Sequence, residues 1–350
     1  MHIQRRVWCT LRVIAGLIWL DFFPWVADAN VFTLSEPPYT VAECFADEYV
    51  NQRGLGADYD LFMPTVGSHC HGTNHQDIDW IERVVFLGDS ITVGTPPTLS
   101  ASYYRSQLSD ALADRFGLSY GGLEWLWKRV NPFDGVSIIR EAGDFASCAH
   151  WGDGNADLLY DNTQLERCFP PDKRNLRTLV VMTSGGNDLA KLTRNAIAGA
   201  PVEELWMQIM EIVQLKSEVI NWLVGDPAKF PNGVFVIFAN IYEFSDGTGD
   251  VQSCDISDLV GFDEPLPVPE QLVEMLVWAN EQYLRIAVES GTDMIFMAEA
   301  FCGHGFNHDD PTSPCYRGPE TDRWFDLTCI HPNPTGHGEL ANMFLAVVNE

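Results

Sequence analysis

The sequence predicts an α/β fold in which a central parallel sheet is covered by helices on both faces. Two observations support this prediction. Short apolar runs, several of them rich in β-branched residues, alternate along the chain with longer amphipathic segments. The runs are apolar throughout, which is typical of strands that are buried on both faces. Strands that alternate with helices generally pair in parallel, with helices packed on either side.

The expected elements begin with a strand at 83–87 and a helix at 100–116. They continue with a short strand at 136–139, a stronger strand at 176–183, a helix at 202–223, a strand at 234–238, a helix at 268–289, a strand at 294–297 and a helix at 336–348. In parallel sheets the ligand site lies beyond the carboxyl ends of the strands. Chemically useful residues should therefore directly follow the apolar runs.

The segment before the first strand has a different character. Residues 1–29 resemble a secretory signal peptide, with two arginines before a short apolar run and small residues at its end. The alternatives are a membrane anchor, although the run is too short to span a bilayer, and a misassigned start. Residues 30–82 are rich in turn formers, so we expect an irregular, disulfide-tied extension before a domain at 83–350.

Removal of the signal peptide would leave an even number of cysteines, which predicts disulfides in an exported protein. Short loops close at the least entropic cost, so we expect each cysteine to pair with a neighbour in sequence. The expected pairs are Cys44–Cys70, Cys148–Cys168, Cys254–Cys302 and Cys315–Cys329. Free buried thiols are the alternative.

The net charge of −28 argues against some partners. Such an acidic surface repels nucleic acid and anionic lipid headgroups. It is compatible with a neutral or cationic substrate and with a well-solvated extracellular surface. No segment after the N-terminus is long and apolar enough to span a bilayer, so we expect a soluble monomer that is secreted or periplasmic.

A serine directly follows the first expected strand, in the segment Gly88-Asp89-Ser90. A serine at the carboxyl end of a strand can project its hydroxyl into a cleft. The preceding glycine permits a tight turn, and backbone N–H groups there can face an oxyanion. The segment lacks the Gly-x-Ser-x-Gly pattern of the α/β-hydrolase nucleophile elbow. By itself it is more typical of an ordinary turn.

Two later segments change that interpretation. Ser184-Gly185-Gly186-Asn187-Asp188 follows the strand at 176–183, where the amide of Asn187 could donate to an oxyanion. His331 stands just before the last helix, where its imidazole could take a proton from Ser90. Serine needs such a base, because its hydroxyl is a weak nucleophile.

These three segments, in this order, resemble the SGNH or GDSL family of serine esterases and lipases over roughly residues 83–345. The family's Gly-Asp-Ser block is matched at 88–90, with Ile91 in place of the usual leucine. The Gly-x-Asn-Asp block is matched at 185–188, and the histidine block is matched by His331, Pro332, Gly336 and His337. The resemblance implies a flavodoxin-like three-layer α/β/α sandwich, the SGNH hydrolase fold.

The resemblance also implies a hydrolase that cleaves carboxylic esters without a cofactor. Ser90 would be the nucleophile, and its backbone N–H would be one oxyanion donor. Asn187 would be a second donor, and His331 would be the base. A glycine of the second block would be the third donor, with Gly152 as the first choice and Gly154 as the alternative.

The group that orients His331 departs from the family pattern. The family has an aspartate three residues before the histidine, and this chain has Thr328 there. Asp326 is the candidate for the orienting carboxylate, and a backbone carbonyl is the alternative. The substrate stays open between a lipid acyl ester and the acetyl ester of a carbohydrate. A secreted binding protein without turnover is the non-enzyme alternative, and only Thr328 favours it.

Two histidine clusters and one acidic loop are further candidates for a site. The histidines are His69, His71 and His75 around Cys70, and His304 and His308 before Asp309 and Asp310. Their spacing fits no regular element and Cys70 is expected in a disulfide, so we expect no metal. Loop 245–266 is rich in Asp and Gly but does not match an EF-hand, and we expect a solvated loop that could line the site.

Overall fold

The computed structural model describes residues 39–45, 57–160 and 163–350. All of them belong to the unit that spans residues 36–350. The expected signal peptide at 1–29 and the first part of the expected extension lie outside the described residues. Within the described ranges, no helix combines the length and apolar character that a bilayer crossing requires.

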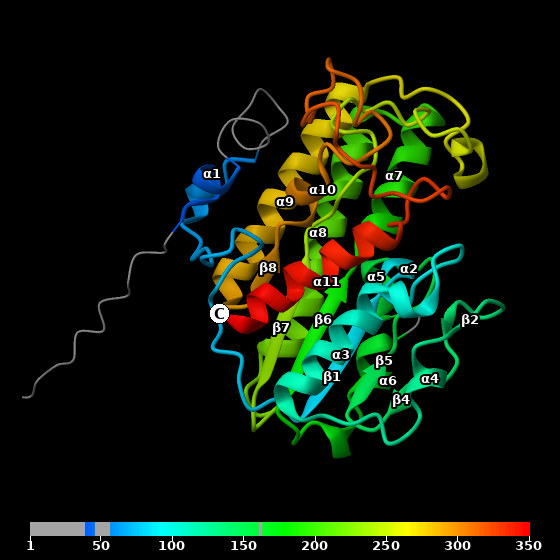
Figure 1. Cartoon of the computed structure of the whole chain (residues 1–350). Coiled ribbons are helices and arrows are strands. Elements are labelled where there is room, and N and C mark those ends of the chain that lie inside the picture. Colours follow the sequence, from blue (N-terminus) through cyan, green and yellow to red (C-terminus); the bar gives the residue numbers. More distant parts are fainter. Residues whose placement is uncertain (1–38, 46–56, 161–162) are drawn as a thin grey trace, which may run out of the picture. The chain divides into compact units, whose positions relative to one another are not determined.

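The described residues form a six-stranded sheet at the centre of the fold (Figure 1). In spatial order its strands are β4 (Glu141–Ala142), β5 (Phe145–Ser147), β1 (Arg83–Gly88), β6 (Thr178–Thr183), β7 (Val234–Ala239) and β8 (Asp293–Ile295). Only the edge pair β4–β5 in this sheet is antiparallel. Numbered in chain order, the parallel strands are arranged 2-1-3-4-5, which is the flavodoxin-like order. The expected fold class is therefore confirmed, with an antiparallel edge strand added.

The sheet is apolar on both faces, because successive side chains of a strand point to opposite sides. In β1, Val84 and Phe86 belong to one core cluster, whereas Val85 and Leu87 belong to another. Every residue of β1 and of β6 is buried. This two-sided burial explains why the strands are apolar at nearly every position.

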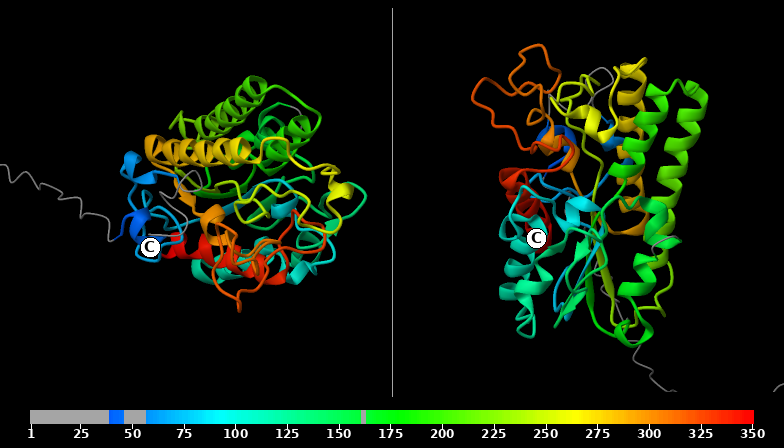
Figure 2. Two further views of the ribbon diagram at one scale, coloured as in Figure 1. Left: turned by 90° about the horizontal axis from the view of Figure 1, so that it is seen from above. Right: turned by 90° about the vertical axis from the view of Figure 1, so that its right-hand side faces the viewer.

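Helices cover both faces of the sheet (Figure 2). One face carries α3 (Tyr104–Phe116) and α11 (Pro334–Asn349), and the other carries α8 (Val202–Val224) and α9 (Pro269–Ser290). A third apolar cluster joins α7 (Gly186–Ile197) to α8 and α9. The shorter helices are α1 (Val41–Cys44), α2 (Ser90–Val93), α4 (Glu124–Trp127), α5 (Asn155–Leu159), α6 (Gln164–Cys168) and α10 (Met297–Phe301). Single 3₁₀ turns lie at η1 (Tyr59–Phe62), η2 (Ser100–Ser102), η3 (Pro171–Lys173) and η4 (Ser257–Val260).

The strand expected at 136–139 lies outside the central sheet. It is shortened to β3 (Val136–Ser137), which pairs antiparallel with β2 (Val130–Asn131) in a separate hairpin. The strand beside β1 is instead β5, whose three residues are too few to show a periodic pattern. The strand expected at 294–297 ends at Ile295, because α10 begins at Met297.

The described part of the N-terminal extension has little regular structure, as expected. It is tied by the Cys44–Cys70 disulfide and runs along the edge strand β8. Gly72 forms an antiparallel bridge with Ile295, and the Thr73 N–H donates to Met294 O at 2.9 Å. The extension therefore satisfies backbone groups that an open sheet edge would leave exposed.

Four disulfides join the described cysteines, and two of them differ from the expected pairs. Cys44–Cys70 and Cys148–Cys168 pair as expected. The expected pairs Cys254–Cys302 and Cys315–Cys329 are wrong, because the structure joins Cys254 to Cys329 and Cys302 to Cys315. Residues 245–262 fold back against the segment before His331, so Cys254 meets a cysteine 75 residues away. Packing of these segments thus overrides the entropic preference for short loops.

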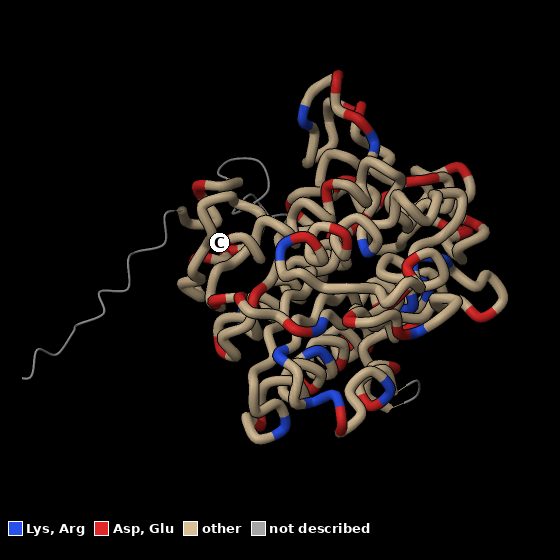
Figure 3. Tube along the Cα trace, turned by 60° about the horizontal axis from the view of Figure 1, so that its bottom comes forward, with Lys and Arg blue, Asp and Glu red and all other residues tan. Residues whose placement is uncertain are grey.

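Acidic residues are spread widely over the described part of the chain (Figure 3). Lys and Arg are scattered among more numerous Asp and Glu. A nucleic-acid site needs a clustered basic surface. The chain therefore carries an excess of negative charge, and the expectation that it repels polyanions stays a prediction.

Candidate active site

Ser90 stands at the carboxyl end of β1, as the first residue of α2. Gly88 has φ +120°, and a Cβ there would lie 1.7 Å from Thr183 O of the adjacent strand, so only glycine fits. The carboxylate of Asp89 caps α2 by accepting the Ile91 N–H at 3.0 Å and also accepts the Thr183 hydroxyl at 3.1 Å. These contacts fix the turn that presents Ser90. As the first helical residue, Ser90 has a backbone N–H without an intrahelical partner.

Asn187 approaches Ser90 from the neighbouring strand. It is the second residue of α7, which follows β6, and β1 and β6 are adjacent in the sheet. The strand order reverses beside β1, where flavodoxin-like sheets bind their ligands. Nδ2 of Asn187 donates to Asp153 O at 2.9 Å, which leaves the second amide hydrogen for a ligand. Ser90 and Asn187 line the same two pockets.

Of the two candidate glycines, Gly152 lies at this site. It lines a pocket together with Ser90, Asn187 and His331, and its φ is +83°. The N–H of Gly154 instead donates to Asp157 Oδ2 at 2.7 Å. The geometry therefore favours the first choice, Gly152, over the alternative.

The loop that carries Gly152 is anchored to the end of β1. Gln164 in α6 accepts the Gly88 N–H at 2.9 Å and donates both to Gly88 O at 2.8 Å and to Asp153 Oδ2 at 2.7 Å. The Cys148–Cys168 disulfide joins the start of this loop to the end of the same helix. Gln164 thus sets the position of the loop relative to Ser90, and sequence reasoning missed it.

His331 completes the group from the loop before α11. Its Nε2 lies 2.8 Å from Ser90 Oγ, and its Nδ1 lies 2.7 Å from Thr328 Oγ1. The Thr328 hydroxyl in turn donates to Asp326 Oδ1 at 2.5 Å. The expectation that Asp326 contacts the imidazole directly needs correction, because Thr328 stands between them. Burial lowers the pKa of His331 to about 4 and raises the pKa of Asp326.

A buried polar network lies beneath the site. Lys216 in α8 is fully buried, and its Nζ donates to Ser184 Oγ at 2.6 Å. Ser184 donates to Asn155 Oδ1 at 2.8 Å. Burial lowers the pKa of Lys216 to about 7 and raises the pKa of Asp89 to about 7. The attraction between the two opposite charges makes both of these shifts smaller. The sequence contained a signal for this network, because Lys216 continues the apolar face of the helix expected at 202–223.

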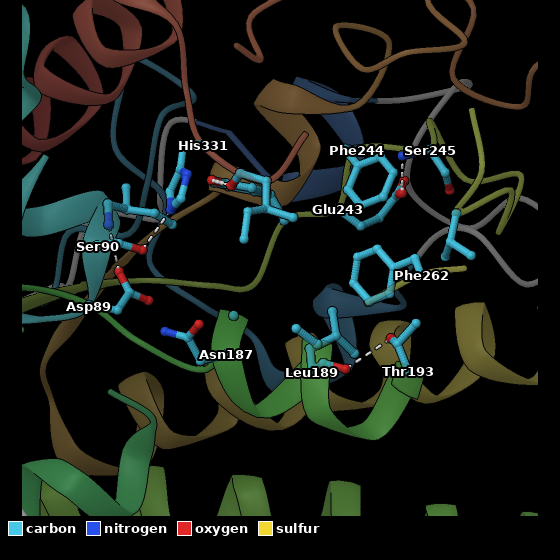
Figure 4. Close-up of a pocket in the computed structure, with 16 residues that line it drawn as sticks. Asp89, Ser90, Asn187, Leu189, Thr193, Glu243, Phe244, Ser245, Phe262 and His331 are labelled. Carbon is cyan, nitrogen blue, oxygen red and sulfur yellow. Dashed lines mark hydrogen bonds between the residues drawn. The ribbon is translucent and has the colours of Figure 1, made fainter. Parts of the chain in front are cut away.

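An apolar pocket opens beside Ser90 (Figure 4). It holds about 670 Å³ of space, part of which is open to solvent. Ser90, His331 and Asn187 lie at one end in Figure 4, and Phe244 and Phe262 lie at the other. The apolar lining is Ile91, Leu189, Ala190, Phe244, Val251, Phe262 and Ile330, and the half-buried Glu243 also lines the pocket. The pocket can therefore hold an apolar group whose reacting end reaches the Ser90 hydroxyl.

Loop 245–266 lines this pocket, as expected, through Val251 and Phe262. The loop is less solvated than expected. Asp246 is buried and accepts backbone N–H groups from Gly303, Gly305 and Asn307 at 2.8–2.9 Å. Its carboxylate therefore joins this loop to the next one and is occupied by backbone donors rather than directed toward a cation.

The histidine clusters have other partners. Cys70 is in a disulfide, His69 lies 2.8 Å from the Glu350 carboxylate, and His75 contacts Thr292 O at 2.8 Å. His304 stacks on Trp324. Among the described residues, no three His, Cys, Asp or Glu side chains are grouped as a metal site. His337, in the first turn of α11, accepts the Tyr104 N–H at 3.3 Å within the core.

The family model of the GDSL-like lipase/acylhydrolase family matches residues 86–338. The chain belongs to this family. As a member of the GDSL-like lipase/acylhydrolase family it is an ester-cleaving hydrolase, and the match includes Ser90, Asn187 and His331.

Two solved structures are similar to the chain. A member of the lipolytic protein G-D-S-L family from Veillonella parvula is 14% identical in sequence to this chain, and the TM-score is 0.39. The match covers 77% of this chain and 98% of the Veillonella parvula chain. A putative GDSL-like lipase from Parabacteroides merdae is 13% identical in sequence to this chain, and the TM-score is 0.44. The match covers 78% of this chain and 99% of the Parabacteroides merdae chain. No curated protein matches the chain significantly.

Proposed function

We propose that this chain is a secreted serine esterase that hydrolyses esters of apolar acyl chains through an acyl-enzyme on Ser90. The observation that carries the proposal is the apolar pocket, which begins at the Ser90 hydroxyl and extends beneath loop 245–266. An acetyl group would leave most of this pocket unfilled, whereas a longer acyl chain would displace water from its apolar wall.

The reaction begins with proton transfer from Ser90 to Nε2 of His331, which lies 2.8 Å from the hydroxyl oxygen. The Ser90 oxygen then attacks the ester carbonyl, and a tetrahedral oxyanion forms. The oxyanion is held by the backbone N–H groups of Ser90 and Gly152 and by the free amide hydrogen of Asn187. His331 next donates its proton to the leaving alcohol. Water, activated by the same imidazole, then hydrolyses the acyl-enzyme.

The two pockets that meet at Ser90 suggest separate places for the two parts of the ester. The acyl chain occupies the pocket beneath Phe244 and Phe262. The alcohol leaves through the more open pocket lined by Thr95, Trp151 and Gly152. The apolar character of the first pocket favours this assignment, because an acyl chain gains most from burial there.

A chain-length series of p-nitrophenyl esters tests the proposal. Each buried methylene contributes about 0.8 kcal/mol, which is about fourfold in kcat/KM, so activity should rise steeply from acetate until the pocket is full. Ala190→Phe, which fills the pocket, should shift the preference toward acetate. Leu259→Phe is the control, because Leu259 is 81% exposed within loop 245–266 and does not line the pocket. A preference for acetate in the wild type, with activity on acetylated polysaccharide, would support a carbohydrate esterase instead.

Labelling with a fluorophosphonate separates the enzyme from a binding protein without turnover. Such a probe reacts with activated serines, so it should modify Ser90 and leave Ser90→Ala unlabelled. Absence of labelling in the folded wild type would contradict the nucleophilic role of Ser90.

Secretion and the division into a signal peptide (1–29), an extension (30–82) and a hydrolase domain (83–350) are part of this proposal. Four disulfides support an oxidising compartment. Mass spectrometry of the exported protein should find a mature N-terminus near residue 30 and no free thiol. Retention of residues 1–29 would argue against a cleaved signal.

A further inference from the structure

We propose that Thr328 is the residue that positions the catalytic imidazole, acting as a hydroxyl relay between His331 and a buried Asp326. The inference rests on the proposed function, since it concerns the same serine and histidine. Three consecutive contacts support it: Ser90 Oγ to His331 Nε2 at 2.8 Å, His331 Nδ1 to Thr328 Oγ1 at 2.7 Å, and Thr328 Oγ1 to Asp326 Oδ1 at 2.5 Å.

Only one arrangement of protons satisfies these three hydrogen bonds when His331 acts as the base. Nε2 must be unprotonated to receive the proton of Ser90, so Nδ1 carries the ring hydrogen. Nδ1–H then donates to the oxygen of Thr328. The single hydroxyl hydrogen of Thr328 donates to Asp326, because an ionised carboxylate can only accept. Thr328 thus selects the reactive tautomer, a task that a carboxylate performs directly in the usual triad.

The relay is built into a tight turn. Asp326 Oδ1 also accepts the Thr328 N–H at 2.8 Å, and the Asp326 N–H donates to His331 O at 2.9 Å. Phe325 and Pro332 form an antiparallel bridge at the base of the turn. The disulfide from Cys329 holds the turn against loop 245–266. These constraints limit movement of the Thr328 hydroxyl away from the imidazole.

The relay leaves the imidazole without a charged group in contact with Nδ1. In a direct Asp–His pair the carboxylate stabilises the imidazolium and raises the histidine pKa. Here the contact is a neutral hydroxyl, and burial dominates the environment of the ring. The titratable groups around the relay are Asp89 after β1, Tyr103 before α3, Tyr242 after β7, His337 in α11, and Asp326 and Arg323 on the segment before His331.

Three variants test the relay. Thr328→Val keeps the shape but loses the hydroxyl, and Thr328→Ser keeps the hydroxyl. The double variant Asp326→Asn/Thr328→Asp places a carboxylate at the usual family position and removes its like-charged neighbour. For each variant, kcat and KM are measured across pH 3–9 with the p-nitrophenyl ester that the wild type cleaves fastest. At acid pH the released alcohol is detected discontinuously. Circular dichroism checks that each variant is folded.

The expected results differ between the variants. Thr328→Val should lower kcat about 100-fold at unchanged KM, within the range typical of general-base catalysis. Thr328→Ser should stay within about threefold of the wild type, since its hydroxyl can make the same contacts. The double variant should regain much of the activity, and the acid limb of its profile should move up by about one pH unit or more, because a carboxylate now touches the imidazole.

Any of three results would overturn the relay. One is wild-type kcat and pH profile in Thr328→Val. Another is an active double variant with an unshifted acid limb, which decides the question even if Thr328→Val does not fold. An inactive double variant, together with a Thr328→Ser variant as impaired as Thr328→Val, would also contradict the relay. Failure of the proposed function gives a different outcome, because the wild type would then neither hydrolyse the ester nor react with the fluorophosphonate.

Discussion

Cys254 and Cys329 join the loop that covers the apolar pocket to the segment that carries His331. Val251 and Phe262 of that loop line the pocket on either side of Cys254 in sequence, and Cys329 lies two residues before the imidazole. Tyr242 adds a second link, because its hydroxyl donates to Ile330 O at 2.6 Å. The wall of the proposed acyl pocket and the proposed base are therefore held together covalently and by hydrogen bonding.

Cys254→Ser/Cys329→Ser should impair long-chain substrates more than short ones. The bond closes a loop with a sequence separation of 75, so its loss should lower the free energy of unfolding by about 4 kcal/mol. Cys302→Ser/Cys315→Ser is the control, because that pair closes a separation of only 13 and lies outside the pocket lining. Urea denaturation and the ester series measure both effects. Equal chain-length profiles in the two variants would show that the bond does not shape the pocket.

Ser90→Ala and Asn187→Ala should affect catalysis to different extents. Ser90→Ala should abolish ester hydrolysis, because it removes the nucleophile. Asn187→Ala should lower kcat by about 100- to 1,000-fold with little change in KM, as expected when a donor acts mainly on the developing oxyanion. Steady-state kinetics checks both, and circular dichroism confirms folding. A folded Ser90→Ala variant with full activity would refute the mechanism.

Gln164→Leu should reduce kcat although Gln164 does not line either pocket at Ser90. The change removes three hydrogen bonds that hold the Gly152 loop to the end of β1. We expect a fall in kcat of about tenfold or more, because a small displacement of an oxyanion donor weakens catalysis strongly. We also expect a loss of about 2 kcal/mol in the free energy of unfolding. Gln214→Leu, on the exposed side of α8, is the matched control and should change neither quantity appreciably.

The pH dependence of kcat/KM should reflect the buried state of His331. The imidazole acts as a base only when it is neutral, and burial lowers its pKa to about 4. Activity should therefore persist below the usual histidine pKa of about 6.5 and fall as the pH decreases through about 4. The kcat/KM profile of a non-ionising ester measures this, because it reports the free enzyme. Circular dichroism at each acid pH shows whether the enzyme stays folded there, and a midpoint near 6.5 in the folded enzyme would contradict the buried environment.

The chemical groups of the site were predictable because they follow local patterns. Ser90 and Asn187 come directly after apolar runs, and adjacent parallel strands bring their carboxyl ends to one edge of the sheet. His331 precedes an amphipathic helix with a recognisable start. Gly152 was predicted from the family's second block. The strand before it, β5, was missed because β5 has only three residues.

Contacts between loops depended on tertiary structure. Sequence spacing suggested neighbouring disulfides, but the return of loop 245–266 over the sheet end brought Cys254 to Cys329 instead. Likewise, Asp326 and Thr328 were both visible before His331, yet only the fold of the turn placed the hydroxyl between the carboxylate and the imidazole. The sequence by itself determined the longer strands of the sheet, the long helices α3, α8, α9 and α11, and the residues at the strand ends, because these depend on local periodicity. Tertiary structure alone decided the pocket, the Cys254–Cys329 disulfide and the relay, because these depend on side-chain directions and on contacts between distant segments.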